Sequence, residues 1–307
     1  MTVVERERVV ERGRVRERRA EERVPVAASA ATVYGILADV TEWPLLLPYV
    51  VHAEPLPPCA GDSPGTRTRI WAVRDGEFVR WVSRRRYDPG RRRIGFACTA
   101  ADGTGGDGVW TVTPHGDGRC VLGVRHRPGL LPAAVVDRLL RAVRERAEER
   151  DRGELTVSRF TQVTPLQGPP EAALDFLYRA EGWPGRAGEV VRAAEVDEPV
   201  PGAQLLTLRT PHGRTTRSAR LCFPHAGRLV HRQTSAGGVP GAAGHTGEWT
   251  VLPGARGAVL RARHSVLLHR PRGAGDPGDV TGELARTARV LADAARRRAS
   301  SAGVRML

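Results

Sequence analysis

The stretch "VWTVTPHGDGRCVLGVRHR" at residues 109–127 returns later in the chain as "EWTVLPGARGAVLRARHSV" at residues 248–266. Both copies carry Trp-Thr-Val-x-Pro, a glycine-containing turn, a second run of alternating residues and a histidine near its end. Alternation of apolar and polar residues predicts strands with one buried face, and a turn between two such runs predicts a hairpin. A hairpin that recurs about 140 residues later predicts a duplicated fold.

Three further blocks recur in the same order. "VYGILADVTEWP" (33–44) pairs with "ALDFLYRAEGWP" (173–184), and "WVSRRRYDP" (81–89) pairs with "TRSARLCFP" (216–224). Both copies then run into an arginine-rich amphipathic segment, expected to be a long helix. Four matched blocks at nearly constant spacing predict two copies of one domain of about 140 residues each.

Each copy shows one order of predicted elements: a short strand, a helix, several alternating strands and a closing long helix. Ser29 is the expected N-cap of the first helix, and the Trp-Pro pair is expected to end or kink it. The pattern predicts an α+β unit in which a curved antiparallel sheet wraps the last helix. The predicted segments are an N-terminal charged extension (1–18), a first domain (19–152), a second domain (153–300) and a tail (301–307). The best candidate for a linker between the domains is 152–158.

Composition restricts the class of protein. The net charge is +14 and 40% of the residues are hydrophobic, which is ordinary for a globular protein apart from the charge. All 48 basic residues are arginine and the densest basic stretch alternates with glutamate, so codon bias and a solvated arm explain the charge better than nucleic-acid binding. No membrane segment, signal peptide or CxxC pair is found, and we expect a cytoplasmic protein with four reduced cysteines.

"RWVSRRRYDP" at residues 80–89 reads as a strand with four arginines. One face would hold Arg80, Val82, Arg84 and Arg86, which suits solvent, and the other would hold Trp81, Ser83, Arg85 and Tyr87, which suits the wall of a cavity. A guanidinium keeps its charge and is costly to bury unpaired. The strand pattern alone leaves Arg85 open between a pocket residue and a salt bridge to Glu77 or Asp88.

The order of elements, "ADVTEWP", the "WVSRR" strand and the "GVWTV" strand resemble the aromatase/cyclases of aromatic polyketide synthesis, which belong to the START-like helix-grip superfamily. The tandem copy resembles their di-domain form in bacterial type II polyketide synthases. The resemblance implies two helix-grip domains, each with an internal cavity between sheet and long helix. It also implies that the enzyme closes and dehydratively aromatises the first ring, with C7–C12 closure, of a reduced poly-β-ketone held on an acyl carrier protein. Its implied partners are this carrier and other synthase components, and no metal or cofactor is expected.

Residue by residue, the resemblance and the chemistry of a developing enolate give two sets of candidates. A permanent cation would stabilise charge on oxygen, and Arg85 is the expected stabiliser, with Tyr49, a bound water or Ser83 to transfer protons. The catalytic candidates are Arg85, Ser83, Tyr49 and Arg220. The substrate-binding candidates are Trp43, Trp81, Tyr87, Trp110, Ser218 and Trp249.

Structural alternatives remain open for these candidates. The tryptophans are also typical core residues, and the two serines can bond a neighbouring strand. His126 and His264 occupy equivalent positions and would be proton carriers or structural hydrogen-bonding groups. No metal-ligand spacing is found among His212, His225, His231 and His245. The glycine-rich stretch 102–108 is expected to be a flexible rim. A START-like binding protein for a hydrophobic ligand, without turnover, is the alternative function.

Overall fold

The computed structural model describes residues 20–59, 67–127, 133–234, 241–254, 257–270 and 277–304. The predicted N-terminal extension and the last three residues of the predicted tail lie outside these ranges. Contacts group the chain into two compact units, Met1–Glu42, Ala53–Ile70 and Arg80–Arg152 in one, and Trp43–His52, Trp71–Val79 and Gly153–Leu307 in the other. The predicted domain limits stay a prediction. No helix of the described chain is long and apolar enough to cross a membrane.

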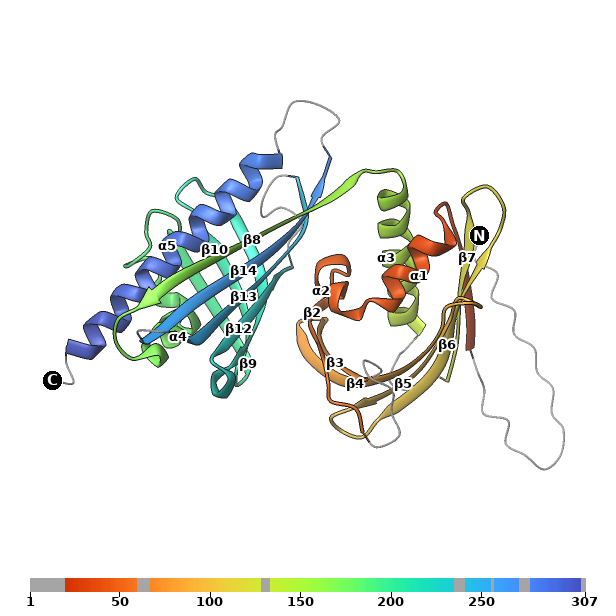
Figure 1. The fold of residues 1–307 in the computed structure, drawn as a ribbon, viewed down its shortest axis with the longest axis horizontal. Coiled ribbons are helices and arrows are strands. Elements are labelled where there is room, and N and C mark those ends of the chain that lie inside the picture. The colour runs from red at the N-terminus through yellow and green to blue at the C-terminus, as the bar shows by residue number, and fades with distance from the viewer. Residues whose placement is uncertain are drawn as a thin grey trace. The chain divides into compact units, whose positions relative to one another are not determined.

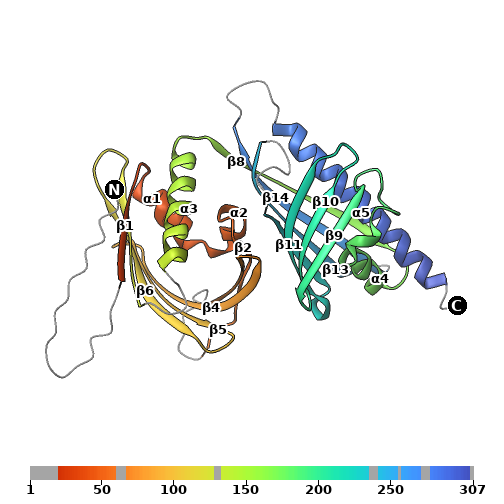
Figure 2. The same ribbon diagram turned by 180° about the vertical axis from the view of Figure 1, so that it is seen from behind.

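The first repeat forms a seven-stranded sheet with antiparallel neighbours (Figure 1). Its strands, in spatial order, are β1 (Ala20–Val26), β7 (Cys120–His126), β6 (Gly105–Pro114), β5 (Arg93–Ala100), β4 (Glu77–Asp88), β3 (Arg67–Arg74) and β2 (Val50–Pro55). The sheet curves around its helices, and Figure 2 shows the same curvature from behind. The helices are α1 (Ala30–Ala38), the 3-10 turn η1 (Val40–Glu42), α2 (Trp43–Leu46) and α3 (Ala133–Asp151).

Helix α1 begins as its sequence predicts. Ser29 is extended, and its hydroxyl accepts a hydrogen bond from the backbone N–H of Thr32 at 3.1 Å, as an N-cap does. Asp151 at the end of α3 accepts hydrogen bonds from Ser29 N and Thr32 Oγ1. A carboxylate is favourable at the positive end of a helix dipole, so α3 fixes the start of α1.

The second repeat has a sheet of the same order. Its strands are β8 (Leu155–Leu166), β14 (Gly257–His269), β13 (Ala242–Gly254), β12 (Arg228–Gln233), β11 (Thr215–Phe223), β10 (Ala203–Arg209) and β9 (Ala193–Val200). The helical elements are α4 (Pro170–Tyr178), η2 (Ala180–Gly182), η3 (Pro224–Ala226) and α5 (Pro277–Val304). Helix α5 lies along β8 and β14 and packs against α4 (Figure 1). The predicted α+β helix-grip architecture, twice repeated, is confirmed.

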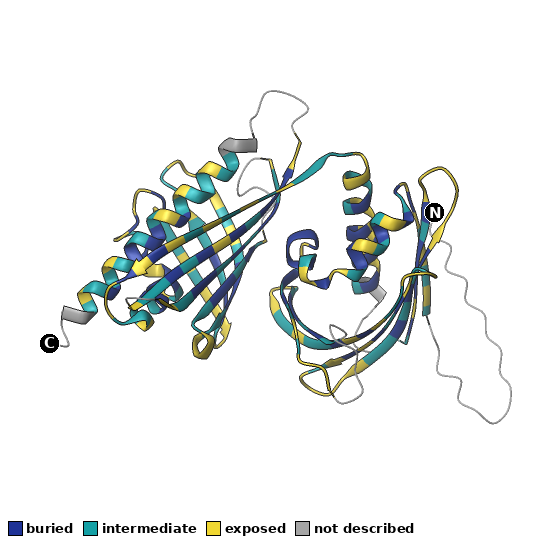
Figure 3. Ribbon diagram, in the orientation of Figure 1, coloured by how far each residue is buried: buried dark blue, intermediate teal, exposed yellow. Residues whose placement is uncertain are grey.

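Burial follows the predicted faces (Figure 3). The long helices bury one stripe each, with Leu139 and Val143 in α3 and Leu291 and Ala295 in α5 buried. The sheet-facing sides of α1 and α4 are buried in the same way, as their apolar spacing predicts.

Four details differ from the sequence-based expectation. Strand β2 was not predicted. The first Trp-Pro pair does not end a helix but begins α2, because proline is tolerated in a first helical turn, where its missing N–H costs nothing. The expected linker is shorter, because Leu155–Leu166 is strand β8. The expected glycine-rich rim is partly regular, because Gly105–Pro114 is strand β6.

Candidate functional site

Strand β4 carries the predicted alternation. Ser83 and Arg85 are 2% and 3% exposed, whereas Arg84 and Arg86 on the opposite face are exposed. Successive side chains of a strand point to opposite faces, so one strand buries a cation between two solvated ones. The prediction that Arg85 points inward is confirmed.

The buried guanidinium of Arg85 is held by the end of helix α1. Its Nη1 donates a hydrogen bond to the carbonyl oxygen of Leu37 at 2.5 Å. The last carbonyls of a helix have no intrahelical partner and lie at the negative end of its dipole, so a cation there is favourable. Of the two acids proposed as salt-bridge partners, Glu77 is exposed and Asp88 pairs with Arg91.

The second repeat builds the same contact independently. Arg220 on β11 is 2% exposed, and its Nη2 donates to the carbonyl oxygen of Leu177 near the end of α4. The guanidinium also lies 5.2 Å from the centre of the Trp183 ring, within cation–π range. Burial lowers the pKa of Arg220 to about 10, which leaves it charged near neutral pH. Burial lowers the pKa of Arg85 as well.

Two tyrosines surround Arg85 in the first unit. The hydroxyl of Tyr87 is hydrogen-bonded with Arg85 and donates to the carbonyl oxygen of Ala38 at 3.4 Å. The hydroxyl of Tyr34, on α1, is buried and has no hydrogen-bond partner among the described residues. Burial raises the pKa of Tyr34, the charges of Tyr87 and Asp88 add to that rise, and Arg85 opposes it. The arrangement places two phenolic hydroxyls beside one fixed cation.

Ser83 has a partner on the neighbouring strand. It lies opposite Cys98 of β5 in the sheet register, and the two side chains are hydrogen-bonded. Burial raises the pKa of the Cys98 thiol, and the bond from Ser83 opposes that rise. In the second repeat Ser218 is half-buried. The contact of Ser83 fits the structural alternative, a hydrogen bond that joins two strands.

The aromatic candidates occupy several environments. Trp81 and Tyr87 are half-buried, next to Ser83 and Arg85 on the inward side of β4. Trp110 is 2% exposed, and its ring centre lies 5.9 Å from that of Phe96. Trp249 belongs to the hydrophobic core of the second repeat. Trp81 and Tyr87 thus share the inward side of β4 with Arg85, as the alternation of the strand predicts. A core role fits Trp249.

The remaining aromatic candidates, Trp43 and Tyr49, lie on α2 and just after it. Trp43 is buried and Tyr49 is half-buried, and both lie in the segment Trp43–His52 that contacts assign to the second unit. Arg85 lies in the first unit. Their predicted roles, and the predicted cavity, therefore stay predictions.

Arg220 has different neighbours from Arg85. Leu174 and Cys222 stand where the first repeat has Tyr34 and Tyr87. Tyr178, at the end of α4, instead donates a hydrogen bond to the Glu198 carboxylate, and the backbone N–H of Gly202 donates to the same hydroxyl at 3.2 Å. Burial first, and this carboxylate second, raise the pKa of Tyr178 to about 12. The two repeats share a cation and differ in the groups around it.

Comparison with known proteins gives this geometry a family. A family model described as polyketide cyclase / dehydrase and lipid transport matches residues 17–151. Over 297 residues the chain is 34% identical to the granaticin polyketide synthase bifunctional cyclase/dehydratase of Streptomyces violaceoruber, covering 90% of this chain and 87% of the relative. The chain belongs to the polyketide cyclase/dehydratase family. The actinorhodin polyketide synthase bifunctional cyclase/dehydratase of Streptomyces coelicolor is 31% identical over 286 residues, covering 83% and 85%.

Two solved structures resemble this cyclase/dehydratase over both repeats. The di-domain ARO/CYC StfQ from the steffimycin biosynthetic pathway matches with a TM-score of 0.76 and 29% identity, over 92% of this chain and 98% of that one. The di-domain ARO/CYC BexL from the BE-7585A biosynthetic pathway matches with a TM-score of 0.74 and 28% identity, over the same shares. The resemblance to di-domain aromatase/cyclases is confirmed.

Two features of this cyclase/dehydratase were missed from sequence. Tyr34 precedes Leu37 by three residues, so both lie on one helix face. This spacing indicates that Tyr34 lies near Arg85 only once Arg85 is known to contact Leu37. His231, His245 and His264 come from three strands, and their convergence depends on the register of the sheet.

The raised pKa of Tyr178 gives a testable result. An acid whose pKa is raised by folding adds stability below its unfolded pKa, here 10.0, and loses that contribution as the pH rises through about 12. At about pH 11 the tyrosinate absorbance of the wild type and of Tyr178→Phe should therefore be equal, because Tyr178 is still protonated. A loss of one tyrosinate in the variant at this pH, with both proteins folded by circular dichroism, would contradict the assignment.

Proposed function

We propose that this aromatase/cyclase of aromatic polyketide biosynthesis closes and aromatises the first ring of a reduced poly-β-ketone held on an acyl carrier protein. The observation that carries the proposal is the buried guanidinium of Arg85, fixed to the end of α1 between two tyrosines. Burying a cation costs several kcal/mol even after relaxation, and strongly perturbed buried charges are concentrated at functional sites. A catalytic role therefore fits this residue well.

The reaction needs stabilisation of negative charge on oxygen. An enol carbon of the chain attacks a ketone carbon and a carbon–carbon bond forms. The enol loses its O–H proton as its own carbonyl reforms, and the oxygen of the attacked ketone takes up charge and then a proton. A donor fixed before the reaction stabilises that oxygen without reorganisation, and it acts more strongly where water is excluded. A guanidinium carries five N–H donors, and the bond from Arg85 to Leu37 sets the direction of the fork.

Arg85 does not supply the proton, because its group stays charged near neutral pH. Tyr34 and Tyr87 are hydroxyl donors beside it, and we assign them to proton transfer ahead of Ser83, whose hydroxyl bonds Cys98. Burial keeps the pKa of Tyr34 above its ordinary value, so this hydroxyl is protonated near neutral pH and can donate to the substrate. Tyr49, the other hydroxyl expected from sequence, remains a candidate in the proposal.

Aromatisation then proceeds by loss of water alone. The hydroxyl formed by ring closure leaves with a proton from a neighbouring carbon, and the hydroxyl left by an earlier ketone reduction leaves in the same way. The remaining ring ketone enolises, so the ring becomes aromatic with no oxidant. The reduced substrate and C7–C12 closure rest on the resemblance to di-domain enzymes, and the relatives named cyclase/dehydratase carry both reaction types on one chain.

The partners in the proposal are other components of the synthase, and among them the acyl carrier protein. Arg80, Arg84 and Arg86 are exposed along the outward side of β4, directly behind the buried Arg85. A row of cations favours transient binding of an acidic protein and raises the association rate. We therefore assign this row to the docking of an acidic carrier, in a cytoplasmic setting.

Replacement of Arg85 tests the proposed stabiliser. With a minimal synthase and a ketoreductase, Arg85→Ala should lower formation of the aromatised product roughly 100-fold, the effect of removing an oxyanion donor. Arg192→Ala, which removes an exposed arginine of the second repeat, is the matched control and should keep wild-type activity. Arg220→Ala asks whether the second repeat takes part.

Folding and activity are separated by the thermal midpoint of each variant and by Arg85→Lys, which keeps the charge without the planar fork. Equal product from Arg85→Ala and the wild type would remove the stabiliser role. If adding the wild-type protein does not change the products of the synthase, the proposed enzymatic function is wrong. A hydrophobic ligand retained in native mass spectrometry would then indicate a binding protein.

Tyr34 gives a second test, because only its hydroxyl needs to be removed. Tyr34→Phe keeps the ring and relieves a buried unpaired hydroxyl, so thermal stability should be unchanged or higher. The rate of product formation should fall roughly 100-fold, the range for loss of a general acid. Full activity in this variant would exclude Tyr34 as the proton donor.

The docking row is tested by charge reversal. Arg80→Glu, Arg84→Glu and Arg86→Glu together should slow the reaction of the carrier-bound substrate at low salt, and should leave a free substrate mimic unaffected. Arg192→Glu with Arg217→Glu, two exposed arginines of the second repeat, is the control. An equal loss with both substrates would argue against docking.

A further inference from the structure

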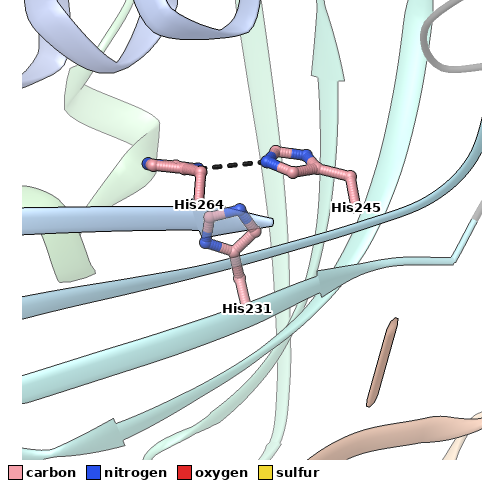
Figure 4. Close-up of side chains that lie close together, drawn as sticks. All are labelled: His231, His245 and His264. Carbon is pink, nitrogen blue, oxygen red and sulfur yellow. Dashed lines mark hydrogen bonds between the residues drawn. The ribbon is translucent and has the colours of Figure 1, made fainter. Parts of the chain in front are cut away.

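Three histidines of the second repeat converge on one face of its sheet (Figure 4). His231 lies on β12, His245 on β13 and His264 on β14, and each offers one ring nitrogen within 4.8 Å of the others. Nε2 of His245 and Nδ1 of His264 are hydrogen-bonded at 3.0 Å. Among the described residues, this is the one group of three or more metal-ligating side chains.

A glycine lets the rings meet. Gly247 lies between His231 and His264 in the register of β12, β13 and β14. A Cβ at this position would lie 2.8 Å from Nε2 of His231 and 2.8 Å from Nδ1 of His264. The His231 and His264 rings therefore occupy the space that a side chain at position 247 would fill, and His245 lies two residues away on the same face of β13.

The first repeat shows that the fold does not need these histidines. There the corresponding row runs through Arg85, Phe96, Gly108 and His126. Phe96 takes the place of His231, and Gly106 takes the place of His245, two residues before the central glycine. The first repeat thus forms the same part of the sheet with one histidine at these three positions. The other two histidines of the second repeat therefore call for a further explanation.

The ring environment suits a ligand role. The His264 ring stacks on that of Phe160, with the ring centres 4.8 Å apart, and makes an edge contact with Trp249, with the ring centres 5.6 Å apart. These contacts fix the orientation of His264.

We propose that His231, His245 and His264 form a site for a divalent transition metal ion of the zinc class. Three imidazoles with an open fourth position are a known zinc coordination pattern, with Zn–N bonds of about 2.0–2.1 Å. A tetrahedral ion then separates its nitrogen ligands by roughly 3.3 Å, so small ring movements from the observed spacing suffice. The hydrogen bond between His245 and His264 would be replaced by two metal bonds.

The neighbouring charges set a requirement on the fourth ligand. The positive charge of Arg220 interacts with His231 and that of Arg232 with His245, and both charges disfavour a bound dication. The negative charges of Glu181 and Glu198 interact favourably with Arg220 and so offset part of its charge. A bound hydroxide or a substrate enolate oxygen would lower the charge of the ion and would face Arg220, so the site should hold the metal together with an anionic oxygen ligand.

Metal binding by the full chain tests the inference without an activity assay. After dialysis against a chelator, the protein should bind one Co²⁺ per chain and show the strong visible absorption of a four-coordinate ion, and Zn²⁺ should displace it. His231→Phe and His245→Gly each place the first repeat's residue in the second, so both variants should fold and should weaken binding by roughly 100-fold or more. His126→Gln, in the first repeat, should bind as the wild type does.

Either of two outcomes overturns the site. One is the absence of stoichiometric Co²⁺ or Zn²⁺ binding by the folded wild type. The other is binding that His231→Phe and His245→Gly leave unchanged while circular dichroism shows both folded, because the ion would then lie elsewhere. The proposed function does not depend on either outcome, since it rests on Arg85.

Discussion

A buried guanidinium donating to the last carbonyls of the first helix is the contact on which each half of this protein depends. It joins a strand in the middle of the sheet to the end of a helix more than forty residues earlier in the sequence. The helix dipole offsets part of the cost of burying the cation. Because Asp151 fixes the start of α1, its end and the guanidinium direction are fixed as well. The fold thus delivers a rigid positive charge to its interior, where charge acts most strongly.

The duplication separates what the fold requires from what each half does. Both repeats keep the inward arginine and the helix carbonyl that accepts its hydrogen bond. Both also keep a glycine, Gly108 or Gly247, two strands away in the same row of the sheet. The first repeat adds two tyrosines around its arginine, and the second adds histidines at positions that hold phenylalanine and glycine in the first. Similar sheets thus carry different side chains around the same buried arginine in the two halves.

Much of the fold could be predicted from the sequence, because repetition and alternation are local signals. The burial of Arg85 between exposed Arg84 and Arg86, the N-cap at Ser29 and the two long helices all follow from spacing. The partner of Arg85 could not be predicted, since a backbone carbonyl has no residue-type signal and Leu37 meets it only through the tertiary fold. The role of Trp-Pro was misjudged, because proline either ends a helix or begins one, and tertiary context decides.

The most direct measurement is a crystal structure of the full chain with a stable, non-cyclising mimic of the poly-β-ketone. The account predicts a mimic oxygen within about 3 Å of the Arg85 guanidinium, with the bond to Leu37 retained and the Tyr34 hydroxyl in reach of the same oxygen. A mimic bound with all its oxygens distant from Arg85, or a guanidinium turned to solvent, would contradict it.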